Sequence, residues 1–296
     1  MIENSSKIIN GSKIALDVCN IVKQQVAALK ENNIYPGLAV IIVGEDPASL
    51  IYVKRKKEMA EKLGIYSNVI YLDKNISQQN LISKINHLNN DPKINGILLQ
   101  LPLPKHIDKR IALETISPLK DVDGLTPTNV GKLALKDETA LAPCTPQGCL
   151  ILVKSVQKHI AGLNAVVIGR SNIVGSPLAA ILLNNDCTVT IIHSKTKNPQ
   201  EISSKADLLF VAAGKQNLVN KDWIKKNAIV VDVGINRINI NEKTKIVGDV
   251  DFEDVIDIVR AITPVPKGVG PMTIACLMKN TIKATCIQEN ISLKDI

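Results

Sequence analysis

Short apolar runs alternate with amphipathic stretches along nearly the whole chain, and this rhythm restricts the fold more than any other feature. Residues 38–43 are apolar and are followed by Gly44, which is typical of a strand buried on both faces. Further strands are expected at 69–72, 96–101, 165–168, 189–192, 208–212 and 229–233. Helices are expected at 46–63, 77–90, 175–185, 199–206, 221–227 and, after Gly270-Pro271, from Met272 to about Asn290. Strands that alternate with helices form parallel sheets, so the sequence predicts an α/β fold.

Residues 118–146 interrupt this rhythm, because they contain several Gly and Pro residues and few periodic stretches. At 296 residues, the chain is long enough for two domains of ordinary size. We therefore place a domain junction in this segment. The alternation of strands and helices resumes at residue 165, so the second half is also expected to contain a parallel sheet.

The composition is that of a soluble globular protein, with 45% hydrophobic and 22% charged residues. The net charge is +8, but the lysines are spread along the chain and are not interleaved with aromatic residues, which disfavours nucleic acid. A solvated basic surface is the first interpretation, and anionic substrates are the second. The longest apolar runs have the length of strands, so no segment is expected to span a membrane.

The six cysteines form no Cys-x-x-Cys pair and no cluster with histidine at zinc spacing, so we expect no metal site. They do not suggest a disulfide scaffold in a chain of this length, and reduced thiols in the cytoplasm fit best. Residues 1–7 include no apolar stretch, so no signal peptide is expected.

A glycine-bearing turn joins the strand at 165–168 to the next helix and predicts a dinucleotide site. Gly169 and Gly175 flank this turn, where backbone N–H groups and the helix N-terminus can face a pyrophosphate. Ser171 stands where the usual G-x-G-x-x-G pattern has its second glycine. Because many loops contain two glycines, the turn does not identify the ligand by itself.

The end of the following strand indicates which dinucleotide would bind. An NAD site has an acidic residue there to hold the ribose 2′-hydroxyl, whereas this strand ends in residues 193–197, with the sequence His-Ser-Lys-Thr-Lys. Ser194 and the lysines suit a 2′-phosphate, and Arg170 can clamp it from the first loop. NADP is therefore favoured over NAD, and the alternative is an ordinary βαβ unit with a basic loop.

Two later strand ends also carry small residues, at Ala213-Gly214 and at Gly234-Ile235. A ligand could approach the backbone closely at both places. Taken singly, each is explained equally well as an ordinary loop that contains a glycine.

Lys56 lies on the predicted helix at 46–63 and shares a face with Tyr52, four residues earlier. Ala48, Met59 and Leu63 fall on the same face. Burial would lower the pKa of a lysine on this apolar stripe and would suit it to acid–base chemistry near neutral pH. The alternative is a lysine that snorkels from the edge of the stripe, and helix geometry alone favours this alternative.

Two polar positions near strand ends are further candidates. Gln100 follows the strand that begins at Gly96, and functional groups in parallel sheets gather beyond the carboxyl ends of strands. It could hold a water or a catalytic amine, or it could be a polar strand end in a Pro-rich turn. Asp123 could accept hydrogen bonds from an amino-pyrimidine, although an Asp-Gly pair also forms simple turns.

Together, these segments resemble the bifunctional methylenetetrahydrofolate dehydrogenase/cyclohydrolase family, and the resemblance covers nearly the whole chain. In the first half it rests on Ile9-Asn10-Gly11, Tyr52-x-x-x-Lys56, Gln100-Leu101-Pro102-Leu103-Pro104, Lys120-Asp121-Val122-Asp123-Gly124 and Pro143-Cys144-Thr145-Pro146-Gln147-Gly148. In the second half it rests on Gly169-Arg170-Ser171, His193-Ser194, Asp232-Val233-Gly234-Ile235-Asn236, Gly248-Asp249-Val250, Thr263-Pro264-Val265-Pro266 and Gly268-Val269-Gly270-Pro271-Met272-Thr273.

The resemblance implies two α/β domains around a cleft. Residues 1–143 plus 272–296 would form a catalytic, folate-binding domain, and residues 144–271 a Rossmann-like domain whose parallel sheet binds NADP. It also implies a homodimer formed through the nucleotide-binding domains. The implied reaction is oxidation of 5,10-methylenetetrahydrofolate to the 5,10-methenyl form, followed by hydrolysis to 10-formyltetrahydrofolate, so tetrahydrofolate derivatives are the implied partners.

The resemblance also implies roles for matching positions. Lys56 is similar to the base/acid of the cyclohydrolase step, Gln100 to the residue that tunes it, and Tyr52 to the residue that packs on the folate and positions the lysine. Asp123 is similar to the pterin anchor. Further substrate contacts are implied for Leu99, Leu101, Pro266, Gly268, Val269 and Gly270. NADP contacts are implied for Thr145, Gly169, Arg170, Ser171, Ser194, Ala213, Gly214 and Ile235.

Two positions depart from the family pattern. Lys267 stands where the family usually has Gly, and Gln216 stands where Pro is common. Neither belongs to the Tyr/Lys/Gln/Asp set, so we expect these departures to affect affinity more than the type of reaction.

Two other functions remain open at this stage. One is a monofunctional NAD(P)-dependent dehydrogenase of similar two-domain shape that acts on another substrate, such as an amino or hydroxy acid. The other is a non-enzymatic nucleotide-sensing module, which would have no need of a catalytic lysine. ATP-dependent ligation of formate is not expected, because no G-x-x-x-x-G-K-[ST] phosphate loop occurs.

Overall fold

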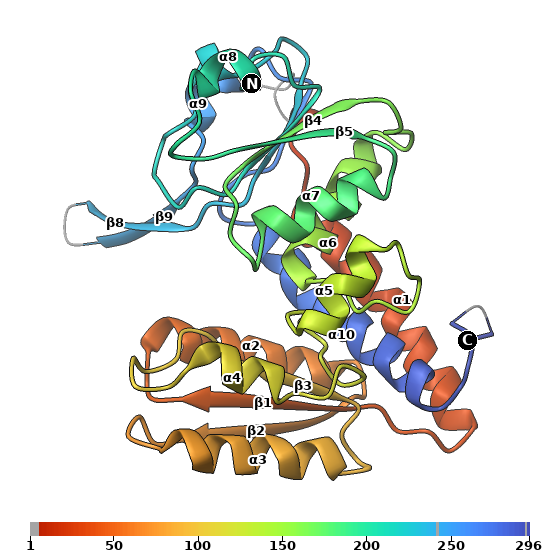
Figure 1. Ribbon diagram of the computed structural model, residues 1–296. Coiled ribbons are helices and arrows are strands. Elements are labelled where there is room, and N and C mark those ends of the chain that lie inside the picture. Colours follow the sequence, from red (N-terminus) through yellow and green to blue (C-terminus); the bar gives the residue numbers. More distant parts are fainter. Residues whose placement is uncertain (1–5, 241–242, 294) are drawn as a thin grey trace. The chain divides into compact units, whose positions relative to one another are not determined.

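The computed structural model describes residues 6–240, 243–293 and 295–296, and the chain divides into two compact units (Figure 1). The N-terminal unit comprises Asp17–Cys144 with Ile274–Ile296, and the central unit comprises Thr145–Thr273 with residues 6–16. Each unit is built on a parallel sheet with helices. The predicted α/β fold is therefore confirmed.

The sheet of the N-terminal unit has three parallel strands in the order β2-β1-β3. They are β1 (Gly37–Val43), β2 (Tyr66–Leu72) and β3 (Gly96–Leu99). Every residue of β1 and β3 is buried, as expected for strands covered on both faces. The helices α3 (Gln78–Asn90) and α4 (Lys109–Glu114) contact each other and share one hydrophobic core with the sheet. The helix α2 (Pro47–Lys62) lies on the opposite side of the sheet from α3 (Figure 1).

Residues 120–122 run alongside β3 and extend this sheet. Asp121 forms a parallel bridge with Ile97, and the Ile97 N–H donates to the Lys120 carbonyl at 2.7 Å. The carboxyl ends of parallel strands meet at one edge of a sheet. Gln100, which follows β3, and Asp123, which follows the added segment, therefore emerge at the same edge.

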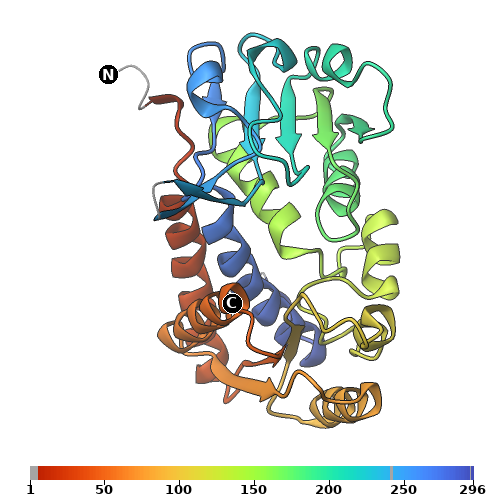
Figure 2. The same ribbon diagram turned by 90° about the vertical axis from the view of Figure 1, so that its left-hand side faces the viewer.

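The sheet of the central unit has five parallel strands in the order β10-β7-β6-β4-β5 (Figure 2). They are β4 (Asn164–Ile168), β5 (Thr188–Ile192), β6 (Leu208–Val211), β7 (Ile229–Asp232) and β10 (Ala261–Ile262). The helix α7 (Gly175–Leu183) leads from β4 out to β5, and α8 (Pro199–Ser203) leads back to β6 on the other side of β4. The strand order thus reverses between β4 and β6, and such switch points bind ligands beyond the carboxyl ends of the strands.

Between β7 and β10 the chain forms an antiparallel hairpin of β8 (Asn236–Ile240) and β9 (Lys243–Val247), which extends away from the five-stranded sheet (Figure 1). It is followed by the buried pair Gly248-Asp249 and by the short helix α9 (Phe252–Val255). The sequence analysis predicted neither the hairpin nor this helix.

Other helices were also missed. They are α1 (Gly11–Glu31), α4, α5 (Pro127–Ala134) and α6 (Cys144–Val156). In α1 the buried residues include Cys19, Val22, Val26 and Leu29. Their spacing of three or four residues is typical of an amphipathic helix, so α1 carried a signal that could have been read.

Three predicted helices need correction. Residues 221–227 form only the 3₁₀ helix η2 (Lys221–Trp223), because Ile224 is already extended and Asn227 has a φ of 65°. The helix predicted at 199–206 ends at Ser203. The last helix, α10 (Val269–Gln288), begins before Met272, since proline is tolerated in the first turn of a helix.

Residues 6–16 belong to the central unit, whereas the resemblance implied that residues 1–143 lie in one domain. Ile8 forms a parallel bridge with Ile262, and the Ile9 N–H donates to the Ile262 carbonyl at 2.8 Å. These contacts attach the described residues 6–16 to β10. The other junctions fall at Cys144 and Thr273, close to the predicted junctions at 143 and 271.

Candidate functional site

The helix α2 carries the predicted catalytic lysine, and both of its ends are fixed. Asp46 Oδ2 accepts hydrogen bonds from the Ser49 N–H and the Ser49 hydroxyl, both at 2.8 Å. Gly64, with a φ of 80°, follows the C-cap and lets the chain turn away. The buried residues of the helix are Ser49, Val53, Lys56 and Ala60.

Lys56 belongs to this buried face, and only 7% of the residue is exposed. The alternative that helix geometry favoured, a lysine snorkelling from the edge of an apolar stripe, is therefore wrong. The observed stripe is rotated from the expected one, because Ala48, Tyr52 and Met59 are only half-buried.

Gln100 holds the lysine in place. Lys56 Nζ donates to Gln100 Oε1 at 2.8 Å, and Gln100 Nε2 donates to the Leu101 carbonyl at 2.7 Å. The second bond fixes the orientation of the amide, so that its oxygen faces the amine. An amide oxygen accepts from a charged ammonium and from a neutral amine alike, and the contact is therefore compatible with both protonation states of Lys56.

Asp123 and Cys144 complete a cluster of titratable groups around Lys56. Burial lowers the pKa of Lys56, and the negative charge of Asp123 opposes this shift. Burial raises the pKa of the Asp123 carboxyl, while Lys56 opposes that change. Burial also raises the pKa of the Cys144 thiol well above its usual value, so this thiol stays neutral at pH 7. The cluster thus contains an amine that loses its proton more readily than an exposed lysine does.

Two side chains that the sequence reasoning did not single out hold the backbone beside Asp123. Asp121 is 1% exposed and accepts hydrogen bonds from the Thr126 N–H at 2.8 Å and the Thr126 hydroxyl at 2.7 Å. The Cys144 thiol donates to the Val122 carbonyl at 3.3 Å. Both residues lie in motifs that carry the family resemblance, and that was their only sequence signal.

The structure brings Lys56, Gln100 and Asp123 together at the carboxyl edge of one sheet, and Tyr52 lies one turn before the lysine on α2. Leu99 is only 2% exposed and belongs to the core beneath the sheet. A substrate contact from Leu99 would therefore come from its backbone. The roles of these residues stay predictions.

In the central unit, the turn after β4 is closely packed. Gly169 has a φ of 118°, and a Cβ there would overlap the Ala212 carbonyl beyond β6. A Cβ on Gly175 would likewise overlap the Gly169 carbonyl. The Ser171 hydroxyl accepts from the Val174 N–H at 3.2 Å and thereby caps the start of α7. Both glycines are needed for this approach of backbone to backbone.

The residues expected to meet a 2′-phosphate are accessible. Arg170, Ser194, Lys195 and Lys197 are all exposed on the loops after β4 and β5. Thr145 is half-buried at the start of α6, and its hydroxyl shares a hydrogen bond with the Thr273 hydroxyl at 2.9 Å. Ala213 and Gly214 are exposed after β6, and Ile235 is exposed after β7. These loops all lie at the carboxyl edge of the five-stranded sheet.

Residues 265–268 form a turn before α10, and Val269 and Gly270 begin that helix. Pro266 and Lys267 are exposed, whereas Gly268 and Val269 are buried. Lys267 has a φ of 80°, and its carbonyl accepts from the Ser12 N–H at 3.1 Å. A left-handed conformation favours glycine, which is the residue the family usually has at this position.

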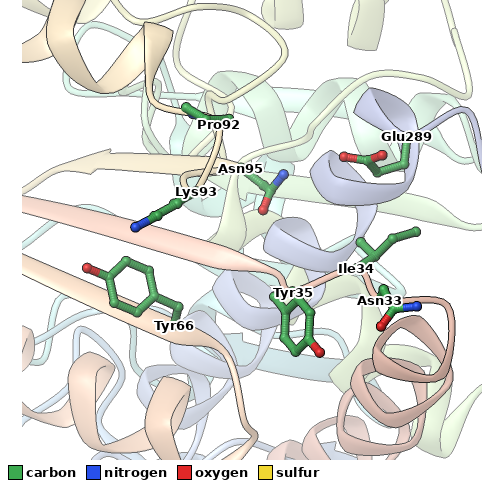
Figure 3. A pocket seen from close by; sticks show the side chains of 8 residues that line it. All are labelled: Asn33, Ile34, Tyr35, Tyr66, Pro92, Lys93, Asn95 and Glu289. Carbon is green, nitrogen blue, oxygen red and sulfur yellow. The ribbon is translucent and has the colours of Figure 1, made fainter.

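A hollow of about 630 Å³ lies on the N-terminal unit at the amino edge of its sheet (Figure 3). Tyr35 precedes β1, Tyr66 begins β2 and Lys93 precedes β3. None of the predicted site residues lines it. Catalytic groups in parallel sheets gather at the opposite, carboxyl edge, so this hollow is separate from the candidate site. Among the helices of the described part of the chain, none is both long enough and apolar enough to cross a membrane.

Comparison with known proteins gives two family matches. Residues 9–123 match "Tetrahydrofolate dehydrogenase/cyclohydrolase, catalytic domain", and residues 143–289 match "Tetrahydrofolate dehydrogenase/cyclohydrolase, NAD(P)-binding domain". The chain is 53% identical to the "Bifunctional protein FolD" of Wolbachia pipientis subsp. Culex pipiens over 98% of this chain and 99% of that protein.

Two solved structures are also similar to this chain. The first is the bifunctional FolD enzyme of Campylobacter jejuni, with a TM-score of 0.92 and 48% identity over 95% of this chain and 99% of that one. The second is the Trypanosoma brucei methylenetetrahydrofolate dehydrogenase-cyclohydrolase complexed with NADP and an inhibitor. It has a TM-score of 0.91 and 36% identity over 95% of this chain and 98% of that one.

Proposed function

The chain belongs to the tetrahydrofolate dehydrogenase/cyclohydrolase family, and from this premise we propose how its residues divide that family's two activities. The enzyme oxidises 5,10-methylenetetrahydrofolate to 5,10-methenyltetrahydrofolate with NADP and hydrolyses the product to 10-formyltetrahydrofolate in one-carbon metabolism. The observation that carries the assignment of roles is the buried Lys56, whose Nζ lies 2.8 Å from Gln100 Oε1.

The residues of the central unit fit a dinucleotide. Gly169 and Gly175 let the turn before α7 pack closely against neighbouring backbone, and the N-terminus of α7 can then face a pyrophosphate. Arg170 and Ser194 bind the 2′-phosphate. Further contacts to the dinucleotide come from Thr145, Ser171, Ala213, Gly214 and Ile235. When bound, NADP supplies the hydride acceptor.

In the first reaction the protein positions the substrate against the cofactor and does not act as an acid or a base. The hydride leaves a carbon that is flanked by two nitrogens, and their lone pairs stabilise the resulting cation. Asp123 anchors the pterin, because a carboxylate can accept two hydrogen bonds from an amino-pyrimidine edge. Tyr52 packs on the folate, and Leu99, Leu101, Pro266, Gly268, Val269 and Gly270 line it. These residues hold the reacting carbon in place.

The second reaction adds water to the cation and uses Lys56. Water must lose a proton as it attacks, and an amine with a lowered pKa can accept that proton near neutral pH. Burial lowers the pKa of Lys56, and Gln100 keeps its Nζ oriented in both protonation states. Lys56 then returns this proton to the folate nitrogen that leaves the carbon. The hydroxyl proton of the intermediate passes to solvent as the formyl C=O forms, so the hydrolysis of the cation releases one proton overall.

The enzyme works as a homodimer in which the central units meet. β5 is the edge strand of the five-stranded sheet, and an unpaired edge can bind a second copy. Ile191 on β5 is 38% exposed and Leu183 at the end of α7 is 63% exposed, so apolar side chains lie beside that edge. The enzyme works in the cytoplasm, where its six buried cysteines stay reduced.

The function is tested by mixing the purified protein with 5,10-methylenetetrahydrofolate and NADP, or with NAD, and following NADPH and methenyl absorbance. We expect NADPH without accumulation of the methenyl compound, and faster hydrolysis of added methenyl compound than in buffer. Accumulation of the methenyl compound would leave only a dehydrogenase and would refute the role of Lys56. Binding of NADP without turnover would instead support a nucleotide-sensing module.

A further inference from the structure

Two buried aspartates link the loops at the carboxyl edge of the central sheet, and neither has a part in the two reactions described above. Asp249 is 0% exposed and Asp232 is 3% exposed. Asp232 ends β7, and Asp249 follows the β8–β9 hairpin. Buried carboxylates are costly unless their oxygens accept hydrogen bonds, so their partners show what they hold.

Asp249 holds the loop after β6. Its Oδ2 accepts from the Ala213 N–H at 2.7 Å and from the Gly214 N–H at 2.8 Å. Its Oδ1 accepts from Asn236 Nδ2, at the start of β8, at 2.8 Å. One carboxylate therefore fixes two residues of the predicted NADP site directly, and it fixes Asn236, which is the neighbour of a third such residue, Ile235.

Asp232 in turn holds Asp249. Its Oδ1 accepts from the Asp249 N–H at 3.0 Å and from the Gly234 N–H at 2.9 Å, and its Oδ2 accepts from the Val250 N–H at 3.0 Å. A Cβ on Gly234 would overlap the Asp249 carboxylate, and a Cβ on Gly248 would overlap that of Asp232. Gly234 and Gly248 therefore leave the space that the two carboxylates occupy.

This arrangement restricts how the loop after β6 can meet a ligand. The N–H groups of Ala213 and Gly214 already donate to Asp249, so a phosphate does not compete for them. Both residues are exposed, and a Cβ built on Gly214 would meet no atom within 4 Å, so the loop is open to solvent while its N–H groups are fixed by Asp249. Burial raises the pKa of Asp232 to about 6, so this carboxylate is mostly ionised at pH 7 and can accept all three N–H groups.

We propose that Asp249, itself held by Asp232, is a positioning residue for NADP, because it fixes the loops at 213–214 and 235 in the geometry that the dinucleotide meets. The inference rests on the proposed NADP site of the central unit. It assigns Asp249 no contact with the substrate or the cofactor and no proton transfer.

The test compares Asp249→Ala and Asp249→Asn with the wild-type full chain. NADP affinity is measured by calorimetry, and hydrolysis of methenyltetrahydrofolate is assayed without NADP. Removing the carboxylate leaves two N–H groups without their acceptor, and we expect the NADP Kd of Asp249→Ala to rise about 10- to 100-fold. The NADP Kd of Asp249→Asn should rise less, because the amide oxygen of Asn can accept the two hydrogen bonds that Oδ2 accepts in the wild type. Hydrolysis and the kcat of dehydrogenation at saturating NADP should change little.

Asp251 supplies a matched control. It lies two residues away, and its carboxylate caps α9 through the Asp254 N–H at 3.5 Å. We expect Asp251→Ala to leave the NADP Kd unchanged. An unchanged Kd in Asp249→Ala would overturn the inference, as would a parallel loss of NADP binding and hydrolysis in both Asp249 variants, since that result means a general role in folding. A wild-type chain that hydrolyses the methenyl compound but does not bind NADP would overturn the proposed dehydrogenase and this inference with it.

Discussion

The two units place their functional groups at the carboxyl edge of a parallel sheet, but they use different kinds of group. In the N-terminal unit the key group is a side chain, Lys56, which is 7% exposed and held by Gln100. In the central unit the key groups are exposed loops, and the buried side chains Asp232 and Asp249 serve to hold the backbone of those loops. In the N-terminal unit, burial thus changes the pKa of a reactive side chain. In the central unit, buried side chains fix the backbone of the ligand-binding loops.

The difference follows from what each unit must do. A proton transfer at neutral pH needs an amine whose pKa is lowered, and desolvation supplies that change at a cost in stability. Dinucleotide binding needs close approach of backbone to phosphate and ribose, and glycines supply that without a change in any pKa. A substitution in the first unit should therefore affect rates, and one in the second should affect affinities.

The largest effect is expected for Lys56→Met, which keeps the apolar stem of the side chain and removes the amine. Loss of a general base typically costs about 100- to 10,000-fold, so we expect hydrolysis of methenyltetrahydrofolate to fall by that factor. Dehydrogenation should be largely retained, because it needs no proton acceptor. Both rates are measured on the same preparation, and an equal fall in both, in a folded protein, would contradict the division of roles.

A smaller effect is expected for Arg170→Ala in the central unit. Hydrogen bonds to charged groups contribute about 1.5–3 kcal/mol, so the KM for NADP should rise about 10- to 100-fold, whereas the KM for NAD should hardly change. NAD serves as the matched ligand, since it lacks the 2′-phosphate. Arg170→Lys keeps the charge but loses the planar guanidinium group. Its KM for NADP should lie between that of the wild type and that of Arg170→Ala. An unchanged preference for NADP would remove Arg170 from the 2′-phosphate site.

The sequence predicted the sheets better than the details of either site. Buried parallel strands are continuous apolar runs, so β1, β4 and β7 could be located within one or two residues. The loops at the strand ends followed from the topology of parallel sheets. The helix predicted at 221–227 failed, because its local pattern did not reveal that the chain is extended at Ile224.

The burial of Lys56 could not be predicted, since it depends on how α2 rotates against the sheet. Periodicity placed the lysine on a stripe with Ala48, Tyr52 and Met59, whereas packing buries it beside Ser49, Val53 and Ala60. Asp249 was missed for a related reason: its partner Gly214 is 35 residues away in the sequence. No local pattern reveals which carboxylate reaches across a sheet edge.

The pH dependence of hydrolysis tests the side-chain chemistry of the N-terminal unit without a mutation. The reactive form of Lys56 is the neutral amine, and burial lowers its pKa. Hydrolysis above the buffer blank should therefore rise by about tenfold per pH unit while the lysine is mostly protonated, and level off above its pKa. Between this lowered pKa and the ordinary pKa of lysine, the folded chain binds fewer protons at this site than the unfolded chain. The stability contributed by Lys56 therefore rises with pH in that higher interval, where hydrolysis has already levelled off. A flat profile from pH 6 to 9 would show that Lys56 does not titrate in the reaction.

The smallest effect is expected for Lys267→Gly, which tests the backbone of the central unit. A lysine with a φ of 80° is strained, and glycine adopts this conformation freely, so the substitution should stabilise the fold by about 1 kcal/mol. For a chain of this size that corresponds to a rise in Tm of about 2–4 °C. Lys158→Gly is the matched control, because Lys158 is exposed and its φ is not positive; there, glycine should lower the Tm or leave it unchanged. Equal shifts in both variants would mean that loss of a positive charge, rather than relief of strain at Lys267, determines the stability.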